Sequence, residues 1–344
     1  MAVQDDLTDS GLRLFLSVDI AGSTKFKASL PSITMTVANN DSRGTDTNDA
    51  VSKSWVKVYI EFFSDFPIQF EIAIREARIK VARNISDDLQ DQIKLWKMLG
   101  DELIFVTNIK KVNDAVTTLL AFHKTIIKYQ KLLQEKHNIL SLKGTAWTAG
   151  FPIRNRRVVN DLPNDQQIED FIGPDMDIGF RLSKLARSGP IVASMDLVDL
   201  LVRHENQSFF NCHFVGWEPM KGVFADKPYP IHWLVEKFKD RELPSWEKEL
   251  PPWEGAICRF TAYYLQHRNN QEHSDQLIDR INKTRASLNQ SDRLGLFEPY
   301  LDKSTMPAQH KEIHDLLERN ERSEFSKAED FGVDEEQQGN TTNE

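Results

Sequence analysis

Two acidic residues beside predicted strands are the first candidates for chemistry. Asp19 lies near the end of the apolar run Leu12–Ile20, and Asp101 lies in a Gly-Asp turn between the apolar runs 93–98 and 103–106. A Gly-Asp dipeptide in that setting indicates a β-hairpin, and adjacent strands would bring the two carboxylates together. Carboxylates a few ångströms apart repel each other, and paired Mg²⁺ or Mn²⁺ ions offset this repulsion where a triphosphate is handled. A single turn Asp more often accepts a backbone N–H, so it is the pair that indicates a metal site.

Predicted strands and helices alternate along the part of the chain that carries these acids. The hydrophobic pattern predicts strands over 12–20, 93–98, 103–106, 140–150, 191–194, 209–217 and 229–235. It predicts helices over 55–82, 177–187, 196–202 and from Asn113 onward. Pro67 marks a break or a new start in the first of these helices. The alternation indicates an α+β domain, an α/β sandwich, that ends near residue 237.

The chain divides into four predicted parts. Residues 1–11 form an N-terminal segment, 12–237 the α+β domain with a polar insert at 31–54, 238–318 a helical extension, and 319–344 a disordered acidic tail. The insert is rich in Asn, Asp, Ser and Thr, and the tail is almost free of large apolar residues. The sequence contains no Walker motif, no dinucleotide-binding motif and no internal repeat.

The composition excludes several classes of protein. With 43 Lys and Arg against 52 Asp and Glu, the 344-residue chain has a net charge of −9, whereas a nucleic-acid partner would favour a basic surface. No apolar stretch reaches the roughly 18 to 20 residues that span a bilayer, and the first ten residues lack the pattern of a signal peptide. Cys212 and Cys258 are too few for a disulfide framework. We therefore expect a cytoplasmic protein that binds neither membrane nor nucleic acid.

Ordered blocks of sequence resemble the class III nucleotidyl cyclases over residues 12 to about 236. Residues 15–24 resemble the first metal strand and phosphate loop of that family, and Lys-Met-Leu-Gly-Asp at 97–101 resembles its second metal hairpin. Residues 143–150 stand where the family has a central strand ending in Gly. Residues 171–182 match its Gly-x-x-x-Asn-x-x-x-Arg helix, and 189–194 match the turn and strand that follow. The resemblance implies a ferredoxin-like βαββαβ core and the cyclisation of a nucleoside triphosphate.

The resemblance also implies roles for individual residues. Asp19 and Asp101 would bind two Mn²⁺ or Mg²⁺ ions per active site, with the carbonyl of Ile20 completing one of the metal sites. The phosphates would be bound by the backbone N–H groups of Ala21, Gly22, Ser23 and Thr24. Arg181 matches the arginine that neutralises the α-phosphate while the ribose 3′-oxygen attacks and pyrophosphate leaves. Since the metal acids and this arginine come from opposite subunits in the family, the resemblance implies a homodimer with two composite sites.

Two features depart from the family pattern. Asp177 stands where the family usually has Asn. A carboxylate can accept a hydrogen bond from a ribose hydroxyl, but it repels phosphate. The lysine that grips the terminal phosphates has no close match, and Lys25 and Lys221 are the candidates for this role.

Lys97 and Asp170 occupy the two positions that select the base in this family. Lys97 lies four residues before the second metal acid, and Asp170 lies three residues before the Gly of the helix motif. This pair reads adenine in adenylyl cyclases. A cationic donor beside a carboxylate acceptor also fits uracil, through O4 and N3–H, and cytosine, through N3 and the amino group. The pair by itself therefore leaves ATP, UTP and CTP open.

Finer features resemble the bacterial pyrimidine cyclases of the Pycsar antiphage systems. They are the Gly-Asp-Glu block at 100–102, the variant helix motif at 177–181, the polar insert and the aromatic-rich helix at 55–70. This resemblance implies that UTP, or next CTP, is cyclised on phage infection to a signal for a separate death-inducing effector. The alternatives are an adenylyl cyclase and a cyclase-fold module that has lost catalysis and binds nucleotides or partners. The presence of both metal acids and Arg181 disfavours the degenerate module.

Overall fold

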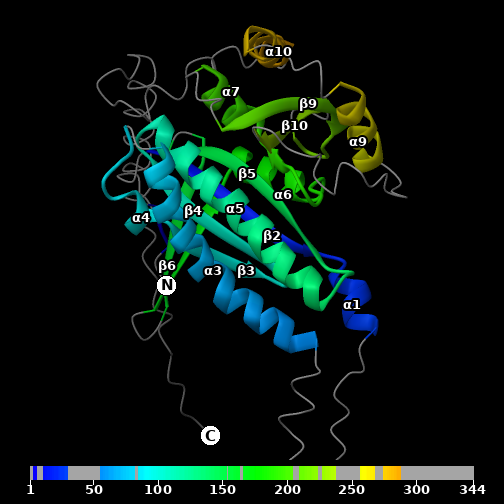
Figure 1. Cartoon of the computed structure of the whole chain (residues 1–344). Coiled ribbons are helices and arrows are strands. Elements are labelled where there is room, and N and C mark those ends of the chain that lie inside the picture. Colours follow the sequence, from blue (N-terminus) through cyan, green and yellow to red (C-terminus); the bar gives the residue numbers. More distant parts are fainter. Residues whose placement is uncertain are drawn as a thin grey trace, which may run out of the picture.

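The computed structural model consists of a large β-sheet with helices packed on it and a smaller sheet at one edge (Figure 1). The larger sheet has seven strands in the order β3-β4-β2-β5-β8-β10-β9. All its neighbouring strands are antiparallel except β5 and β8, which are parallel. The structure describes residues 3–5, 11–29, 55–81, 84–152, 154–162, 166–203, 209–223, 227–237, 256–267 and 274–287.

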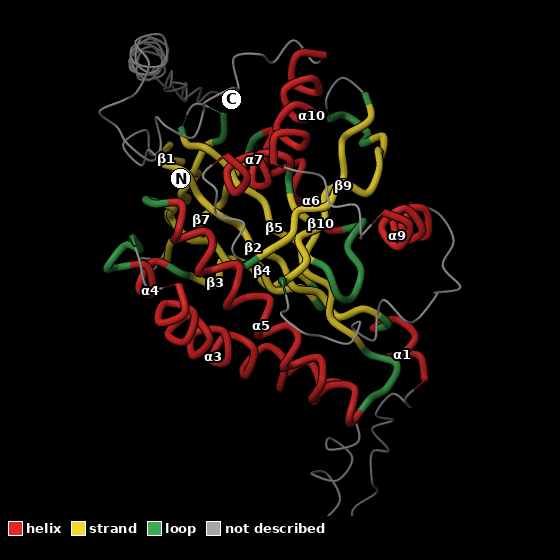
Figure 2. The backbone as a smooth tube through the Cα atoms, turned by 45° about the horizontal axis from the view of Figure 1, so that its top comes forward, coloured by secondary structure: helices red, strands yellow, loops and turns green. Residues whose placement is uncertain are grey.

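One half of the larger sheet is a ferredoxin-like βαββαβ unit, formed in chain order by β2, α3, β3, β4, α5 and β5. The four strands pair in the order β3-β4-β2-β5, and α3 and α5 lie side by side across one face (Figures 1 and 2). The short helices α1 and α4 lie in the connections. The bounds are β2 (Gly11–Ala21), α1 (Ser23–Ser29), α3 (Trp55–Val81), α4 (Leu89–Gln92), β3 (Lys94–Leu99), β4 (Glu102–Ile109), α5 (Val112–Lys136) and β5 (Ser141–Phe151). The predicted α+β class is confirmed.

The helix α3 corrects one prediction. Pro67 was expected to mark a break or a new start, but α3 continues through it as a single helix of 27 residues. An internal proline removes one backbone hydrogen bond and costs about 3 kcal/mol. Phe62, Phe66 and Phe70 are completely buried on one side of the helix, and burying one such side chain contributes about 1.5–3 kcal/mol. Packing on the sheet and on α5 therefore outweighs the local cost of the proline.

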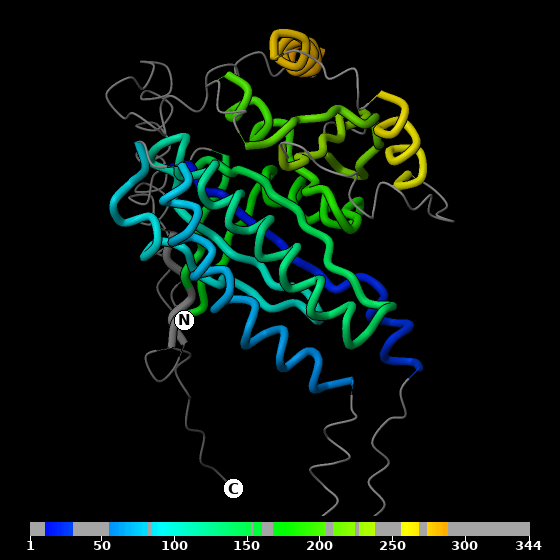
Figure 3. Tube along the Cα trace, in the orientation of Figure 1, coloured from blue at the N-terminus to red at the C-terminus, as the bar shows by residue number. Residues whose placement is uncertain are grey.

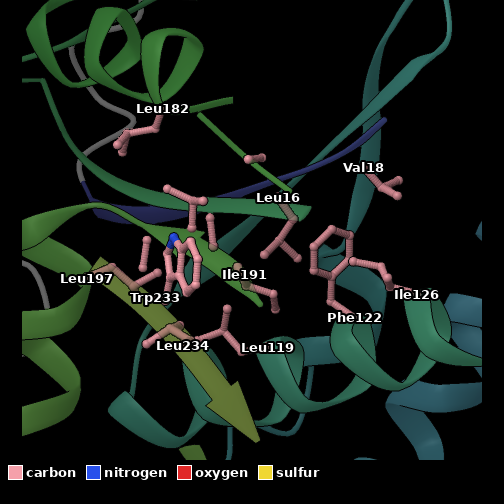
Figure 4. Close-up of a cluster of buried hydrophobic side chains, with 14 of the residues drawn as sticks. Leu16, Val18, Leu119, Phe122, Ile126, Leu182, Ile191, Leu197, Trp233 and Leu234 are labelled. Atoms are coloured by element: carbon pink, nitrogen blue, oxygen red, sulfur yellow. The ribbon is translucent and has the colours of Figure 1, made fainter. Parts of the chain in front are cut away.

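The main hydrophobic core lies between this pair of helices and the sheet. Leu16 and Val18 of β2 point toward Phe122 and Ile126 of α5 (Figure 4). The core continues beneath the second half of the sheet, where Trp233 is fully buried. This second half is built from β8 (Ile191–Ala193), α7 (Met195–Arg203), β9 (Phe210–Pro219) and β10 (Pro228–Glu236).

A smaller aromatic cluster covers the opposite face of the sheet. It joins Phe15 of β2 and Trp147 of β5, whose rings stack with their centroids 5.4 Å apart. Helix α6 (Pro174–Ser183) packs over Trp147 through Gly179, where an added Cβ would lie 2.2 Å from the indole ring. Only glycine permits that approach. The predicted helix over 177–187 begins earlier, with Pro174 in its first turn, and ends earlier, at Ser183.

The smaller sheet pairs β1 (Val3–Asp5), β6 (Arg156–Leu162) and β7 (Gln166–Ile172) in an antiparallel arrangement. Toward the C-terminus, α9 (Ala256–His267) contacts β9, and α10 (Ser274–Ser287) contacts α7 (Figure 3). Side chains of both helices join the main core. The insert at 31–54 and the tail at 319–344 lie outside the described residues, and the four-part division stays a prediction. No helix among the described ranges has the length and apolar character needed to cross a membrane.

Candidate active site

The two predicted metal acids lie at neighbouring points of the sheet, Asp19 near the end of β2 and Asp101 in the turn between β3 and β4. Asp19 of β2 is in register with Glu102 of β4, the residue that follows Asp101 in the hairpin turn. The backbone N–H of Ile20 donates a hydrogen bond to the carbonyl of Asp101 at 3.4 Å. The Gly-Asp turn joins a hairpin as predicted, and the pairing of β2 with β4 brings the two segments together.

Alternation along β2 places Asp19 on the face opposite α5. Leu16 and Val18 belong to the main core, and Phe15 belongs to the aromatic cluster on the other face. Since successive side chains of a strand point to opposite faces, Ser17 and Asp19 lie on the same face as Phe15. The polar residues thus continue the aromatic face toward the end of the strand.

A residue without a predicted role, Lys143, is the cationic partner of this group. Lys143 of β5 is in register with Asp19, and its ammonium lies 2.6 Å from the Asp19 carboxylate. On the other side, the hydroxyl of Ser17 donates a short hydrogen bond to Glu102. We define these residues, Ser17, Asp19, Asp101, Glu102 and Lys143, as the acidic cluster. Nothing local in the sequence singles out Lys143, because its place depends on how β5 pairs with β2.

Burial controls the electrostatics of the acidic cluster. Burial raises the pKa of Asp19 above its usual range, although Lys143 acts in the opposite direction, and the nearby charge of Asp101 adds to the rise. Burial likewise raises the pKa of Glu102, against the effect of the hydrogen bond from Ser17. Both carboxylates therefore hold their negative charge at a cost, which an added cation would relieve.

The donor set of the acidic cluster suits a hard divalent cation. Carboxylate and carbonyl oxygens are the ligands that Mg²⁺ and Mn²⁺ prefer. Asp19 and Asp101 supply the carboxylates, and Ile20 contributes a backbone carbonyl between them. Within the described ranges, no three His, Cys, Asp or Glu side chains are arranged as a metal cluster. The residues present fit a site in which the substrate supplies further oxygen ligands.

Tyr59 of α3 lies against the same end of β2. Its side chain is buried. Burial, with the negative charges of Asp101 and Asp19, raises the pKa of Tyr59 to about 12. The ammonium of Lys27 lies 4.5 Å from the centre of the Tyr59 ring. Tyr59 thus lies near enough to the two metal acids for their charges to act on it, within the main core that α3 covers.

The predicted phosphate loop occupies the turn from β2 into α1. Ala21 ends the strand, and Gly22 has a φ of 85°, a backbone conformation that favours glycine. An added Cβ there would lie 2.4 Å from the carbonyl oxygen of Ile139. Ser23 and Thr24 open the helix α1. The loop directly follows Asp19 and Ile20, so phosphate held there would lie beside the acidic cluster.

Lys97 and Asp170, the predicted base-selecting pair, are in contact. The ammonium of Lys97 on β3 donates to both carboxylate oxygens of Asp170 on β7, at 2.7 and 2.8 Å. The backbone N–H of Phe171 also donates to the Asp170 carboxylate, at 2.8 Å. A register shift in β3 at Trp96 precedes Lys97, and the indole N–H of Trp96 donates to the carbonyl of Glu169. The edge strand and the smaller sheet together hold the pair.

The third group surrounds Arg181 on α6. Its Nε donates to the carbonyl of Lys221 at 2.7 Å, and its guanidinium lies 3.9 Å from the Asp177 carboxylate. Both Lys25 and Lys221 are exposed at the surface. Among the described residues, no ion pair or hydrogen bond joins Arg181, or the Lys97–Asp170 pair, to the acidic cluster. One chain thus carries the predicted site residues as three separate groups.

No family model and no curated protein matches the sequence. Several solved structures do have a similar fold. The adenylyl cyclase CyaB from P. aeruginosa is similar over 70% of this chain and 100% of its own, with 16% identity and a TM-score of 0.42. The guanylate cyclase domain of RhGC from Catenaria anguillulae, solved in complex with GTP, is similar over 67% of this chain and 98% of its own, with 10% identity and a TM-score of 0.41. A monomeric guanylyl cyclase domain from Blastocladiella emersonii is similar over 69% of this chain and 100% of its own, with 10% identity and a TM-score of 0.37. At these identities and TM-scores, the similarity does not indicate a function. Any function must be argued from the site itself.

Proposed function

We propose that this protein is a class III nucleotidyl cyclase, which converts a nucleoside triphosphate to the 3′,5′-cyclic nucleotide and pyrophosphate. The observation that carries the proposal is the meeting of Asp19 and Asp101 at the β2 and β3–β4 strand ends. Two segments predicted as metal strand and metal hairpin converge there, in a ferredoxin-like unit. The contact between Lys97 and Asp170 supports the same assignment.

The residues of this chain would divide the reaction among them. Asp19, Asp101 and the carbonyl of Ile20 would hold two Mn²⁺ or Mg²⁺ ions, which supply Lewis-acid activation of the ribose 3′-hydroxyl and charge neutralisation of the triphosphate. The loop 21–24 would bind phosphate oxygens through its backbone N–H groups. Arg181 would stabilise the charge that develops on the α-phosphate, a contribution on the order of 3–4 kcal/mol for one donor. The ribose 3′-hydroxyl would give its proton to water, its oxygen would form a bond to the α-phosphorus, and the bond between the α-phosphorus and pyrophosphate would break.

The active form would be a homodimer with two composite sites. No ion pair or hydrogen bond joins Arg181 to the acidic cluster within the described part of one chain, which supports a site completed by a second copy. In that arrangement the acidic cluster of one subunit would face Arg181 and the Lys97–Asp170 pair of its partner. An isolated subunit would then lack part of the machinery and be inactive.

The substrate we favour is UTP, with CTP next. The Lys97 ammonium can donate to O4 of uracil, and the Asp170 carboxylate can accept from N3–H. The polar insert and the aromatic-rich helix at 55–70, which resemble those of the Pycsar pyrimidine cyclases, favour a pyrimidine over a purine. An adenylyl cyclase is the second candidate, because the same pair also fits adenine. We further propose that the product signals phage infection to a separate effector, as the Pycsar resemblance implies.

The four nucleoside triphosphates distinguish these possibilities. The purified protein, with Mn²⁺, is incubated with UTP, CTP, ATP and GTP separately, and products are identified by mass spectrometry. We expect cyclic UMP, with cyclic CMP as the next product. Formation of cyclic AMP alone would make the protein an adenylyl cyclase. If no triphosphate is cyclised, the cyclase proposal fails and the degenerate nucleotide-binding module takes its place.

A further inference from the structure

We propose that Lys143 is a built-in counter-ion, which occupies the cation position at Asp19 until a divalent metal displaces it. The inference rests on the proposed function, because it concerns the same metal site. It assigns a positioning role to a residue outside the predicted site. The consequence is that free metal binds weakly to the empty protein.

The Lys143 ammonium contacts the Asp19 carboxylate, which would otherwise be free to bind a metal ion. Lys143 and Asp19 are directly opposite each other in an unbroken stretch of pairing between β2 and β5 that runs from Gly11 to Ala21. The Lys143 ammonium lies 2.6 Å from the Asp19 carboxylate. A carboxylate oxygen engaged by an ammonium at that distance has fewer lone pairs for a metal, and the two cations repel each other.

Lys143 is the cation that offsets the negative charge of the other residues of the acidic cluster. Asp19, Asp101 and Glu102 bring three carboxylates to one end of the sheet, and Glu102 is engaged by the neutral hydroxyl of Ser17. Among the described residues, the Asp19–Lys143 contact is the ion pair that the cluster makes. Removing the ammonium would leave the carboxylates unbalanced, and a divalent ion is the natural replacement.

The side chain can leave while the backbone stays in place. Gly144, the next residue, packs against Phe122 and Ile126 of α5, so β5 is fixed at this point. The Lys143 side chain is 25% exposed and that of Asp19 is 22% exposed, so the ion pair borders solvent. Rotation of a long, flexible side chain therefore frees Asp19 without movement of the strand.

Displacement would be favoured when metal arrives with nucleotide. A triphosphate brings negative charge that attracts the released ammonium, whereas a free metal ion brings only repulsion. The acidic cluster would thus take up its ions together with substrate. When no nucleotide is bound, Lys143 would offset the negative charge of the acidic cluster.

Metal binding without nucleotide tests this role directly. Mn²⁺ is titrated into the full-length wild type and into the Lys143→Met and Lys143→Arg variants by isothermal calorimetry, with Lys110→Met as a control. Lys110 forms an ion pair of 2.5 Å with Asp88 at another surface. We expect Lys143→Met to bind Mn²⁺ about tenfold more tightly, equivalent to about 1.4 kcal/mol. Lys143→Arg keeps the charge and should match the wild type, as should Lys110→Met.

The other outcomes separate the two proposals. Equal or weaker Mn²⁺ binding by Lys143→Met overturns the counter-ion role. If the wild type still cyclises a triphosphate in that case, the proposed function stands. Absence of Mn²⁺ binding in every variant, together with absence of any cyclic product, overturns both. Thermal melting shows whether Lys143→Met is folded. If it is not, Lys143→Gln, which also removes the charge, provides the readout and should likewise bind Mn²⁺ more tightly than the wild type.

Discussion

The ammonium of Lys97 lies 2.7 Å from the carboxylate of Asp170, a residue 73 positions further along the chain. The pair is partly exposed, with 28% and 43% of the two side chains accessible. An ion pair at that exposure contributes at most about 1 kcal/mol to stability. We propose that this donor and this acceptor, which are engaged with each other here, read the edge of the base when substrate binds.

Lys97→Met should therefore impair catalysis far more than folding. Loss of a charged hydrogen bond to the base costs about 1.5–3 kcal/mol, which is about 10- to 100-fold in kcat/KM for UTP. Steady-state kinetics and chemical denaturation on the same preparation measure both effects. Asp170→Asn is the matched variant, and the double variant should lose less than the sum of the two single losses. A fall in stability equal to the fall in activity would contradict the base-reading role.

Asp19→Ala and Asp101→Ala should each abolish cyclisation and leave the dimer folded. Each substitution removes a proposed metal ligand from a strand end and takes no volume from the hydrophobic core. Production of cyclic nucleotide is measured by mass spectrometry, and thermal melting with size-exclusion chromatography reports folding and assembly. Ser17→Ala is the control, because it removes a neutral hydroxyl from the same cluster. A variant that loses activity only because it unfolds would give the metal role no support.

The position of the two acids could be predicted from the sequence, whereas that of Lys143 could not. Asp101 sits in a turn whose residue types encode a hairpin locally, and Asp19 closes an apolar run. The contact of Lys143 depends on the register between β2 and β5, which is set by the whole length of both strands. The continuation of α3 through Pro67 could not be predicted from the local sequence either, because it depends on the packing of α3 against α5, which is a tertiary effect. The packing of Gly179 against Trp147 is likewise a tertiary contact that the local sequence does not specify.

Asp19→Asn should stabilise the metal-free protein at neutral pH, and the gain should fade as the pH falls. The pKa of Asp19 is raised in the folded state, chiefly by burial, so its ionised form opposes folding above the usual pKa of 3.8. Stability linked to this group is present below pH 3.8 and is lost as the pH rises through the folded pKa. Asparagine resembles the protonated acid and avoids that loss. Thermal melting from pH 3 to 7 in the presence of a chelator measures the difference.

Asp88→Asn is a control, because folding shifts the pKa of Asp88 in the direction opposite to that of Asp19. Asp88 is exposed, and the hydrogen bond from Lys110 lowers its pKa in the folded state. Its ionised form therefore favours folding, so Asp88→Asn should not stabilise the protein at pH 7. If both variants shift the melting temperature in the same direction, burial is not what distinguishes Asp19.

The ion pairs of Arg285 should hold the C-terminal helix α10 on the sheet domain. Its guanidinium is 1% exposed and donates at 2.7 Å to both Asp196 and Asp199 of α7. Arg285→Ala removes the buried cation from Asp196 and Asp199, although Asp199 keeps its ion pair with Arg203, and breaking such a buried pair costs about 3–5 kcal/mol. Denaturant unfolding measures the loss. The control is Arg259→Ala, whose ion pair with Glu218 is 65% exposed on the arginine side and should cost less than about 1 kcal/mol. Equal losses in the two variants would show that burial of Arg285 contributes nothing, and that α10 is held by its apolar contacts alone.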